Sequence, residues 1–175
     1  MLSILHSLDI YLLELVNLSF HNFILDHLAL YISYGGIIYF WIIIIILLYL
    51  LGGKKGKDVA KRMLIVLIIT TLITQVVKYV VMRPRPYTEL SSLILLGLGT
   101  DPSFPSGHTS TSTAMSWVLS KEYNWIFMLI PIFVALSRLY IGVHYPSDVM
   151  GGFLLGLGVA YLVERYINCK ILNIN

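Results

Sequence analysis

Residues 37–51 of the chain read IIYFWIIIIILLYLL, a run of apolar side chains without a single charge. Similar apolar blocks recur along the 175 residues, so that 58% of the chain is hydrophobic, only 12% is charged and the mean hydropathy is +0.84. Soluble domains carry about 25% charged and about 45–50% apolar residues. The composition therefore predicts an integral membrane protein.

Glycines and prolines divide the apolar blocks. Gly52-Gly53 ends the first block, and Pro84 and Pro86 end the second, because proline cannot continue a helix. The membrane spans predicted in this way cover residues 37–52, 63–81, 105–120, 125–140 and 146–162. The loop at 87–104 contains one apolar stretch, 93–98, which could be a short interfacial piece.

Two further helices are predicted before the first block. Residues 4–19 and 23–34 are amphipathic, and 4–19 carries Asp9 and Glu14, so we expect it to lie in the membrane interface, with a membrane crossing as the alternative. No Lys or Arg precedes Lys54, so we expect the first helices to belong to the mature protein rather than to a signal peptide. The fold class predicted is all-α: one domain over residues 1–175, a polytopic membrane helix bundle with five to six transmembrane helices and an amphipathic N-terminal helix.

The basic residues indicate the orientation of the bundle. If 54–62 is a cytoplasmic loop, as the positive-inside rule requires, alternation of the spans places eight of the twelve Lys and Arg residues in the cytoplasm. These eight are Lys54, Lys55, Lys57, Lys61, Arg62, Lys121, Arg165 and Lys170. The remaining four, which fall at the opposite face, are Lys78, Arg83, Arg85 and Arg138. Cations at that face contradict the rule, and a bound anion would explain them.

Side chains suited to phosphate chemistry gather at the same face. Those with a proposed role are Lys78, Arg85, Ser106, Gly107, His108, Arg138, His144 and Asp148. Lysine offers a point charge, and arginine offers a planar donor fork for phosphate oxygens. Ser106-Gly107 stands at a predicted helix start, where free N–H groups and the helix dipole attract anions.

Two histidines and one carboxylate could perform the reaction. His144 could attack phosphorus if its ring is held in one tautomer, and Asp148, one helical turn later, can hold it. His108 would then protonate the leaving oxygen as general acid. Isolated histidines are usually satisfied polar residues, and we interpret His6, His21 and His27 in that way.

The complete pattern is Lys78-x6-Arg85-Pro86, Pro105-Ser106-Gly107-His108 and Ser137-Arg138-x5-His144-x3-Asp148. It resembles the three-part signature of the type 2 phosphatidic acid phosphatase superfamily, in particular its bacterial membrane lipid phosphatases. The resemblance implies a reaction without metal or other cofactor, in which His144 is the nucleophile, Asp148 orients it, and His108 is the acid that later activates water. Lys78, Arg85, Ser106, Gly107 and Arg138 would bind the phosphoryl oxygens. Arg83 lies outside the signature and is either an interfacial anchor or a support for substrate binding.

The function expected is hydrolysis of a lipid phosphate or diphosphate through a phosphohistidine. The substrates that the family offers are undecaprenyl diphosphate, phosphatidylglycerophosphate, phosphatidic acid and lipid A 1-phosphate, and the sequence does not rank them. We expect a multi-pass protein of a bacterial inner membrane, with its site facing the periplasm or exterior. No obligate protein partner is evident, and the scattered basic residues disfavour nucleic acid.

Other classes of protein fit the same residues less well. A zinc or iron site on His108, His144 and Asp148 would be surrounded by the like charges of the nearby cations, so an anion fits better. Vanadate-dependent haloperoxidases belong to the same superfamily, but they are soluble. A phosphate or lipid transporter, or an inactive scaffold, would be expected to have lost a histidine, and both are present.

Overall fold

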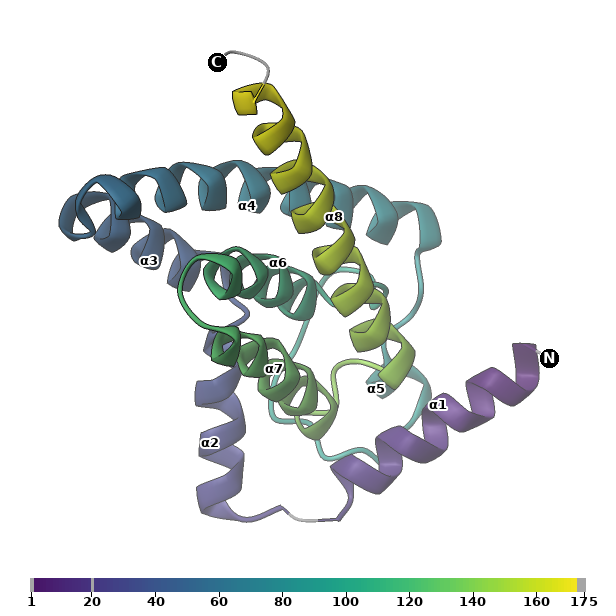
Figure 1. The fold of residues 1–175 in the computed structure, drawn as a ribbon. Coiled ribbons are helices and arrows are strands. Elements are labelled where there is room, and N and C mark those ends of the chain that lie inside the picture. The colour runs from purple at the N-terminus through teal and green to yellow at the C-terminus, as the bar shows by residue number, and fades with distance from the viewer. Residues whose placement is uncertain (1, 20, 173–175) are drawn as a thin grey trace.

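The chain is a bundle of helices joined by short turns and one long loop (Figure 1). The computed structural model describes residues 2–19 and 21–172. Its helices are α1 (Leu2–Asn17), α2 (Phe23–Tyr34), α3 (Ile38–Leu51), α4 (Gly53–Val81), α5 (Pro86–Glu89), α6 (Gly107–Glu122), the 3₁₀ helix η1 (Trp125–Met128), α7 (Leu129–Tyr140) and α8 (Pro146–Leu172). Residues 2–19 and 21–172 contain no β-strand, which confirms the all-α prediction.

Helix α6 lies in the middle of the bundle, where it packs against α3, α4, α7 and α8. Its Ser/Thr run, 109–113, is buried, because small side chains let the helices approach closely. A Cβ atom on Gly156 of α8 would stand 2.3 Å from the carbonyl oxygen of Ser110, and one on Gly152 would stand 2.6 Å from that of Ser106. The α6–α8 contact therefore depends on these two glycines.

The largest apolar cluster joins α3, α4, α6 and α8. Trp41, Met63, Met115, Val118 and Ala160 are almost completely buried within it. In lipid, such contacts stabilise through close packing rather than through exclusion of water. The cluster therefore fixes how these four helices pack against one another.

Several predicted boundaries are wrong. Residues 54–62, expected to form a loop, are the first turns of α4, because Lys and Arg are good helix formers and Gly53, with φ 62°, completes the turn after α3. Helix α6 ends at Glu122 rather than at residue 120, and α8 continues well beyond residue 162. The apolar stretch 93–98 forms no helix. Helix α2, in contrast, has the predicted bounds of 23–34.

Helix α1 has one face against the bundle and one face outside it. The inner face consists of Asp9, Leu13 and Asn17, which are buried at helical spacing. The outer face is apolar, with Leu5, Leu8, Leu12 and Leu15 among its exposed side chains. The predicted N-terminal helix is confirmed, with Asp9 facing the protein, and its place in the membrane interface stays a prediction.

The helices differ in their capacity to cross a membrane. By length and composition, Gly53–Glu89 and Pro146–Ile167 are long and apolar enough, and α2 with α3 qualifies only as a pair bent by 57°. Trp125–Tyr140 is a shorter apolar helix, and α6, with 16 residues, is also too short to meet the criterion. In the part of the chain that the structure describes, two or three spans meet the criterion, and the count of five to six stays a prediction.

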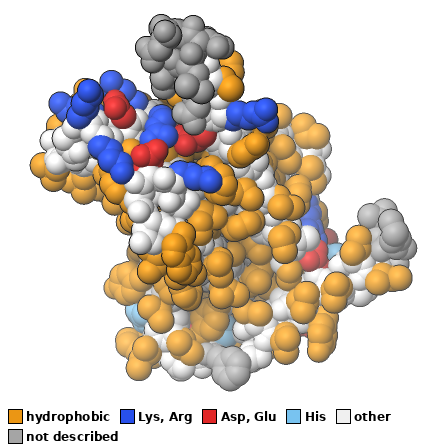
Figure 2. Space-filling model, in the orientation of Figure 1, with side chains coloured by type: hydrophobic (Ala, Val, Ile, Leu, Met, Phe, Trp, Pro, Cys, Tyr) orange, Lys and Arg blue, Asp and Glu red, His pale blue; other side chains and the backbone are white. Residues whose placement is uncertain are grey.

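Charged side chains gather at one end of the face shown in Figure 2, whereas the remainder of that face is mostly hydrophobic. The Nη2 atom of Arg62 in α4 lies 2.6 Å from Oε1 of Glu122 in α6, and its Nη1 atom lies 3.2 Å from Oε2 of Glu164 in α8. The start of α4, the end of α6 and the distal part of α8 therefore share one end of the bundle, as the charge pattern predicted. The side chain of Lys170 lies outside the described residues.

We expect Arg62→Ala to destabilise the fold, because the largely buried Glu164 loses its paired cation, whereas Glu122 keeps only the more distant Lys55. Loss of one partner from a buried ion pair costs on the order of 3 kcal/mol, so the midpoint of thermal unfolding in detergent should fall by several degrees. Lys61→Ala, an exposed cation on the preceding position, is the control and should leave the midpoint unchanged. Equal midpoints for the two variants would contradict the role of Arg62.

Candidate active site

All eight residues singled out for phosphate chemistry lie at the end of the bundle opposite the Arg62 network. They come from the end of α4, the start of α5, the start of α6, the end of α7 and the α7–α8 connection with the first turn of α8. In that order they are Lys78, Arg85, Ser106, Gly107, His108, Arg138, His144 and Asp148. One of the contacts that join these segments is the 2.9 Å hydrogen bond from the backbone N–H of Ser106 to the carbonyl oxygen of Asp148.

Local sequence sets where these segments begin and end. Helix α4 ends at Met82, which adopts a left-handed φ of 50°, and the prolines at 84 and 86 prevent its continuation. Ser106 caps α6, and its hydroxyl accepts a 3.5 Å hydrogen bond from the N–H of Thr109. Lys78 reaches the same helix start, where a Cβ atom on Gly107 would stand 3.8 Å from its Cε atom.

His144 and Asp148 form a buried pair. The Nδ1 atom of His144 lies 3.5 Å from Oδ2 of Asp148 and 3.3 Å from the hydroxyl of Ser103, which itself donates to Oδ2 at 2.5 Å. Since Nδ1 faces the carboxylate, Nε2 is the nitrogen left for nucleophilic attack. Burial lowers the pKa of His144 to about 4 against the opposing effect of Asp148, so the imidazole is neutral, as a nucleophile requires.

Asp101, from the loop before α6, occupies the cationic part of the site. Its carboxylate lies 3.0 Å from Nζ of Lys78 and accepts a 2.6 Å hydrogen bond from Nη2 of Arg85. Burial alone would raise the pKa of Asp101, but Lys78 and Arg85 hold that pKa below its ordinary value. The carboxylate therefore stays ionised on the two cations that we predicted to bind phosphate.

The remaining predicted residues stand between α2, α6 and α7. Arg138 donates a 2.5 Å hydrogen bond from Nη1 to the hydroxyl of Ser33, and its buried Nε atom has no hydrogen-bond partner within residues 2–19 and 21–172. His108 interacts electrostatically with Arg138 and His144. It also packs against Gly36, where a Cβ atom would stand 2.5 Å from the Cβ of His108. The glycine is thus required for the histidine to fit.

A pocket of about 340 Å³ adjoins the site between α3, α4 and α6. Lys78, Asp101, Gly107 and His108 line its polar end. Apolar residues 37–39 at the start of α3 line the other end, across from Thr71, Thr74 and Gln75 of α4, and Tyr39 is exposed on the bundle surface. A ligand could therefore place a charged group at the histidine and an apolar group between α3 and α4.

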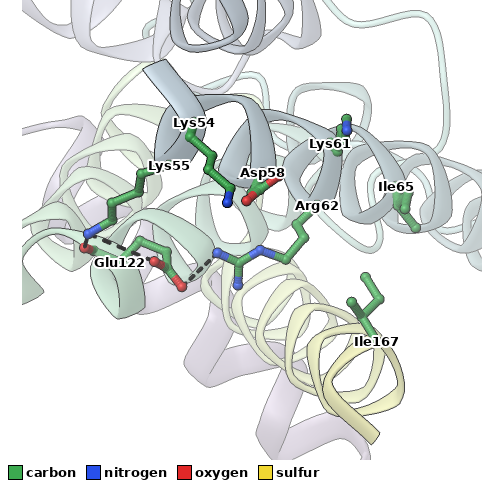
Figure 3. A pocket seen from close by; sticks show the side chains of 8 residues that line it. All are labelled: Lys54, Lys55, Asp58, Lys61, Arg62, Ile65, Glu122 and Ile167. Carbon is green, nitrogen blue, oxygen red and sulfur yellow. Dashed lines mark hydrogen bonds and ion pairs between the residues drawn. The ribbon is translucent and has the colours of Figure 1, made fainter. Parts of the chain in front are cut away.

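A second pocket, of about 850 Å³, lies at the opposite end of the bundle (Figure 3). Lysines of α4 and Arg62 surround it, and the figure shows Lys55 and Arg62 on either side of Glu122. Its lining contains no histidine. None of the residues predicted to take part in phosphate chemistry lines this pocket.

Arg83, expected to be either an interfacial anchor or a support for substrate binding, faces into the protein rather than toward the membrane interface. Its guanidinium donates to Oδ1 of Asp148 at 2.7 Å and to Oδ2 of Asp9 at 2.8 Å, and it stacks on the ring of Tyr145 at 4.1 Å. The side chain points into the protein because two carboxylates are there. Arg83 therefore binds Asp148 through Oδ1, the carboxylate oxygen that does not face His144.

The sequence interpretation missed Asp9, Asp101 and Ser103. Each stands alone in its segment, and the contacts that reveal it span many residues along the chain. Their position in the sequence could have indicated Asp101 and Ser103 as site residues. Both lie just before Pro105-Ser106-Gly107-His108, so the loop that carries them ends at the site. His21 and His27, in contrast, have local partners, Asp26 and the carbonyl of Phe23, as interpreted.

The sequence is similar to those of known phosphatases. Residues 60–171 match the model of the PAP2 superfamily. An undecaprenyl-diphosphatase of Sulfolobus acidocaldarius is 38% identical over 96 residues, which are 52% of this chain and 47% of that protein. The chain spans about half the length of the curated relatives it matches.

Two solved structures share the whole arrangement. LpxE of Aquifex aeolicus matches with a TM-score of 0.83 and 28% identity, over 91% of this chain and 96% of that one. The PAP2-type phosphatidylglycerolphosphate phosphatase of Bacillus subtilis matches with a TM-score of 0.77 and 25% identity, over 94% of this chain and 86% of that one. The helix arrangement is therefore similar to that of membrane phosphatases.

We expect Asp101→Asn to strengthen binding of a phosphate analogue, because the charge that now occupies Lys78 and Arg85 is removed. Orthovanadate should inhibit the variant with an inhibition constant about tenfold lower, which corresponds to about 1.4 kcal/mol. Asp58→Asn, an exposed acid at the opposite end, should leave the constant unchanged. A weaker response to orthovanadate in Asp101→Asn would show that the carboxylate helps to hold the cations in place instead.

Proposed function

Because the chain belongs to the PAP2 superfamily, we propose that it hydrolyses a phosphorylated membrane lipid, without a metal ion, through a phosphohistidine on His144. The observation that carries the proposal is the buried His144–Asp148 pair, with three cations of the signature around it. A neutral imidazole whose Nδ1 is held by a carboxylate presents Nε2 as a nucleophile. The cations stabilise the negative charge that develops on the phosphoryl oxygens.

In the first step, Nε2 of His144 forms a bond to phosphorus while the bond from phosphorus to the lipid oxygen breaks. Lys78, Arg85 and Arg138, with the N–H groups at the start of α6, bind the phosphoryl oxygens in place of Asp101. His108, which is protonated once the phosphate anion lies beside its ring, supplies the proton to the leaving oxygen. The product is a free lipid alcohol, or a lipid monophosphate if the substrate is a diphosphate.

In the second step, water attacks the phosphohistidine. His108, now neutral, takes one proton from the water, the phosphorus–nitrogen bond breaks, and inorganic phosphate leaves. Asp148 keeps the His144 ring in the same orientation through both steps. The enzyme returns to its starting state without a metal or a redox cofactor.

A lipid substrate fits the pocket beside His108. The polar end of the pocket is lined by Lys78 and His108. Its other end lies between α3 and α4, beside the apolar residues 37–39. The relatives act, by name, on undecaprenyl diphosphate in one case and on phosphatidylglycerolphosphate in another. We infer the same chemical class, a phosphate or diphosphate on a long apolar chain.

The reaction is tested by phosphate release from a panel of lipid phosphates and diphosphates in detergent with EDTA present. We expect release by the native protein, none detectable from His144→Ala, and a rate about 10²- to 10⁴-fold lower from His108→Ala. His27→Ala, a histidine outside the site, is the control and should keep full activity. Acid-quenched protein should carry a phosphoramidate that is absent from His144→Ala. Equal release by native protein and His144→Ala, or loss of release with EDTA, would refute the mechanism.

We further propose that the site faces the outer side of a bacterial inner membrane, because the Arg62 end carries most of the lysines and arginines. Leu98 in the loop before α6 is exposed at the site end, and Cys169 is exposed at the other end of the bundle. A membrane-impermeant maleimide added to intact spheroplasts should label Leu98→Cys and leave Cys169 unlabelled until the membrane is opened. Labelling of Cys169 alone would reverse the orientation.

A further inference from the structure

Asp9 of helix α1 reaches the region of the proposed active site. Asp9 is buried, and its Oδ1 atom accepts a 2.9 Å hydrogen bond from the backbone N–H of Ser147, at the start of α8. The Ser147 hydroxyl donates to Oδ2 of the same carboxylate. Asp9 therefore caps the helix that carries Asp148, although the two acids are far apart in the sequence.

Arg83 connects Asp9 to Asp148. Its Nη2 atom donates to Oδ2 of Asp9 at 2.8 Å, and its Nη1 atom donates to Oδ1 of Asp148 at 2.7 Å and to the Ser147 hydroxyl at 2.6 Å. A planar guanidinium holds two carboxylates in a fixed relation, which a lysine cannot do. The ring of Tyr145 stacks on Arg83, and its hydroxyl donates to Glu89 at 2.7 Å.

The two carboxylate oxygens of Asp148 have different hydrogen-bond partners. Oδ1 accepts from Arg83, whereas Oδ2 accepts from Ser103 at 2.5 Å and from the N–H of Tyr145 at 2.8 Å, and faces Nδ1 of His144 at 3.5 Å. The carboxylate cannot rotate without breaking these contacts. Whatever fixes Arg83 therefore also fixes the partner of the proposed nucleophile.

We propose that Asp9 is a positioning residue for His144, acting through Arg83 and Asp148. Without Asp9, Arg83 and the N–H group of Ser147 lose their shared anion, and Asp148 becomes free to reorient. The inference rests on the proposed function for its kinetic consequence, but the positioning itself is a property of the resting protein. It makes the geometry at His144 depend on whether α1 is seated against the bundle.

Asp9→Asn tests this role, because the amide keeps the size and one acceptor but loses the charge that pairs with Arg83. With a lipid phosphate of the panel, we expect kcat to fall about 10- to 100-fold while KM changes less than about twofold, since Asp9 does not contact the phosphate site. Glu14→Gln removes another acid of α1, which bonds only Ser92 among the described contacts, and should keep native kcat. Asp9→Asn/Arg83→Lys should lose no more than the worse single variant, because both act through Asp148.

A second measurement does not require activity. Protein labelled with ¹⁵N-histidine, with His144→Gln used for assignment, reports the ring nitrogens of His144. Asp9→Asn should shift these resonances, and Glu14→Gln should not. Absence of lipid phosphatase activity in native protein would refute the proposed function while the resonances still test the positioning. Unchanged His144 resonances, or a kcat loss in Asp9→Asn matched by Glu14→Gln, would overturn the proposal.

Discussion

Burial of the carboxylate of Asp148 constrains the rest of this structure. A buried charge is costly unless it is paired and hydrogen-bonded, and Asp148 is completely buried. Its donors come from the end of α4, the loop before α6 and the backbone that precedes α8. Because one carboxylate has to meet all of them, the positions of these segments are set together. His144 then adopts its place in the same set of contacts.

Three carboxylates pair with three of the four cations around the site. Asp101 lies on Lys78 and Arg85, and Asp9 and Asp148 share Arg83. Arg138 differs, since its described hydrogen bond goes to a hydroxyl. In the proposed reaction, the incoming phosphoryl group takes the place of Asp101 and leaves the Arg83 contacts intact. Lys78 and Arg85 would therefore exchange Asp101 for phosphate, whereas Arg83 would keep Asp9 and Asp148 throughout the reaction.

The sequence allowed much of this arrangement to be predicted, for physical reasons that differ by residue. The signature residues could be placed at one end because apolar blocks and helix breakers fix the order of the helices. Residues 54–62 were wrongly assigned to a loop because they are highly charged. They are helical because lysine and arginine have high helix propensity. Asp9, Asp101 and Ser103 could not be assigned, since an isolated acid or serine has no local pattern, and its partners are known only when the chain is folded. The structure supports two or three spans by composition, so the count of five to six rests on the sequence alone.

The pocket between α3 and α4 has a consequence for how a substrate would be supplied. A lipid that enters sideways keeps its chains among other chains, so it avoids the cost of about 0.8 kcal/mol for each CH₂ group drawn into water. Its encounter with His144 is then a diffusion in two dimensions. The rate of encounter then depends on the mole fraction of the lipid substrate in one leaflet. Adding inert lipid or detergent lowers that mole fraction, just as adding buffer lowers the concentration of a soluble substrate.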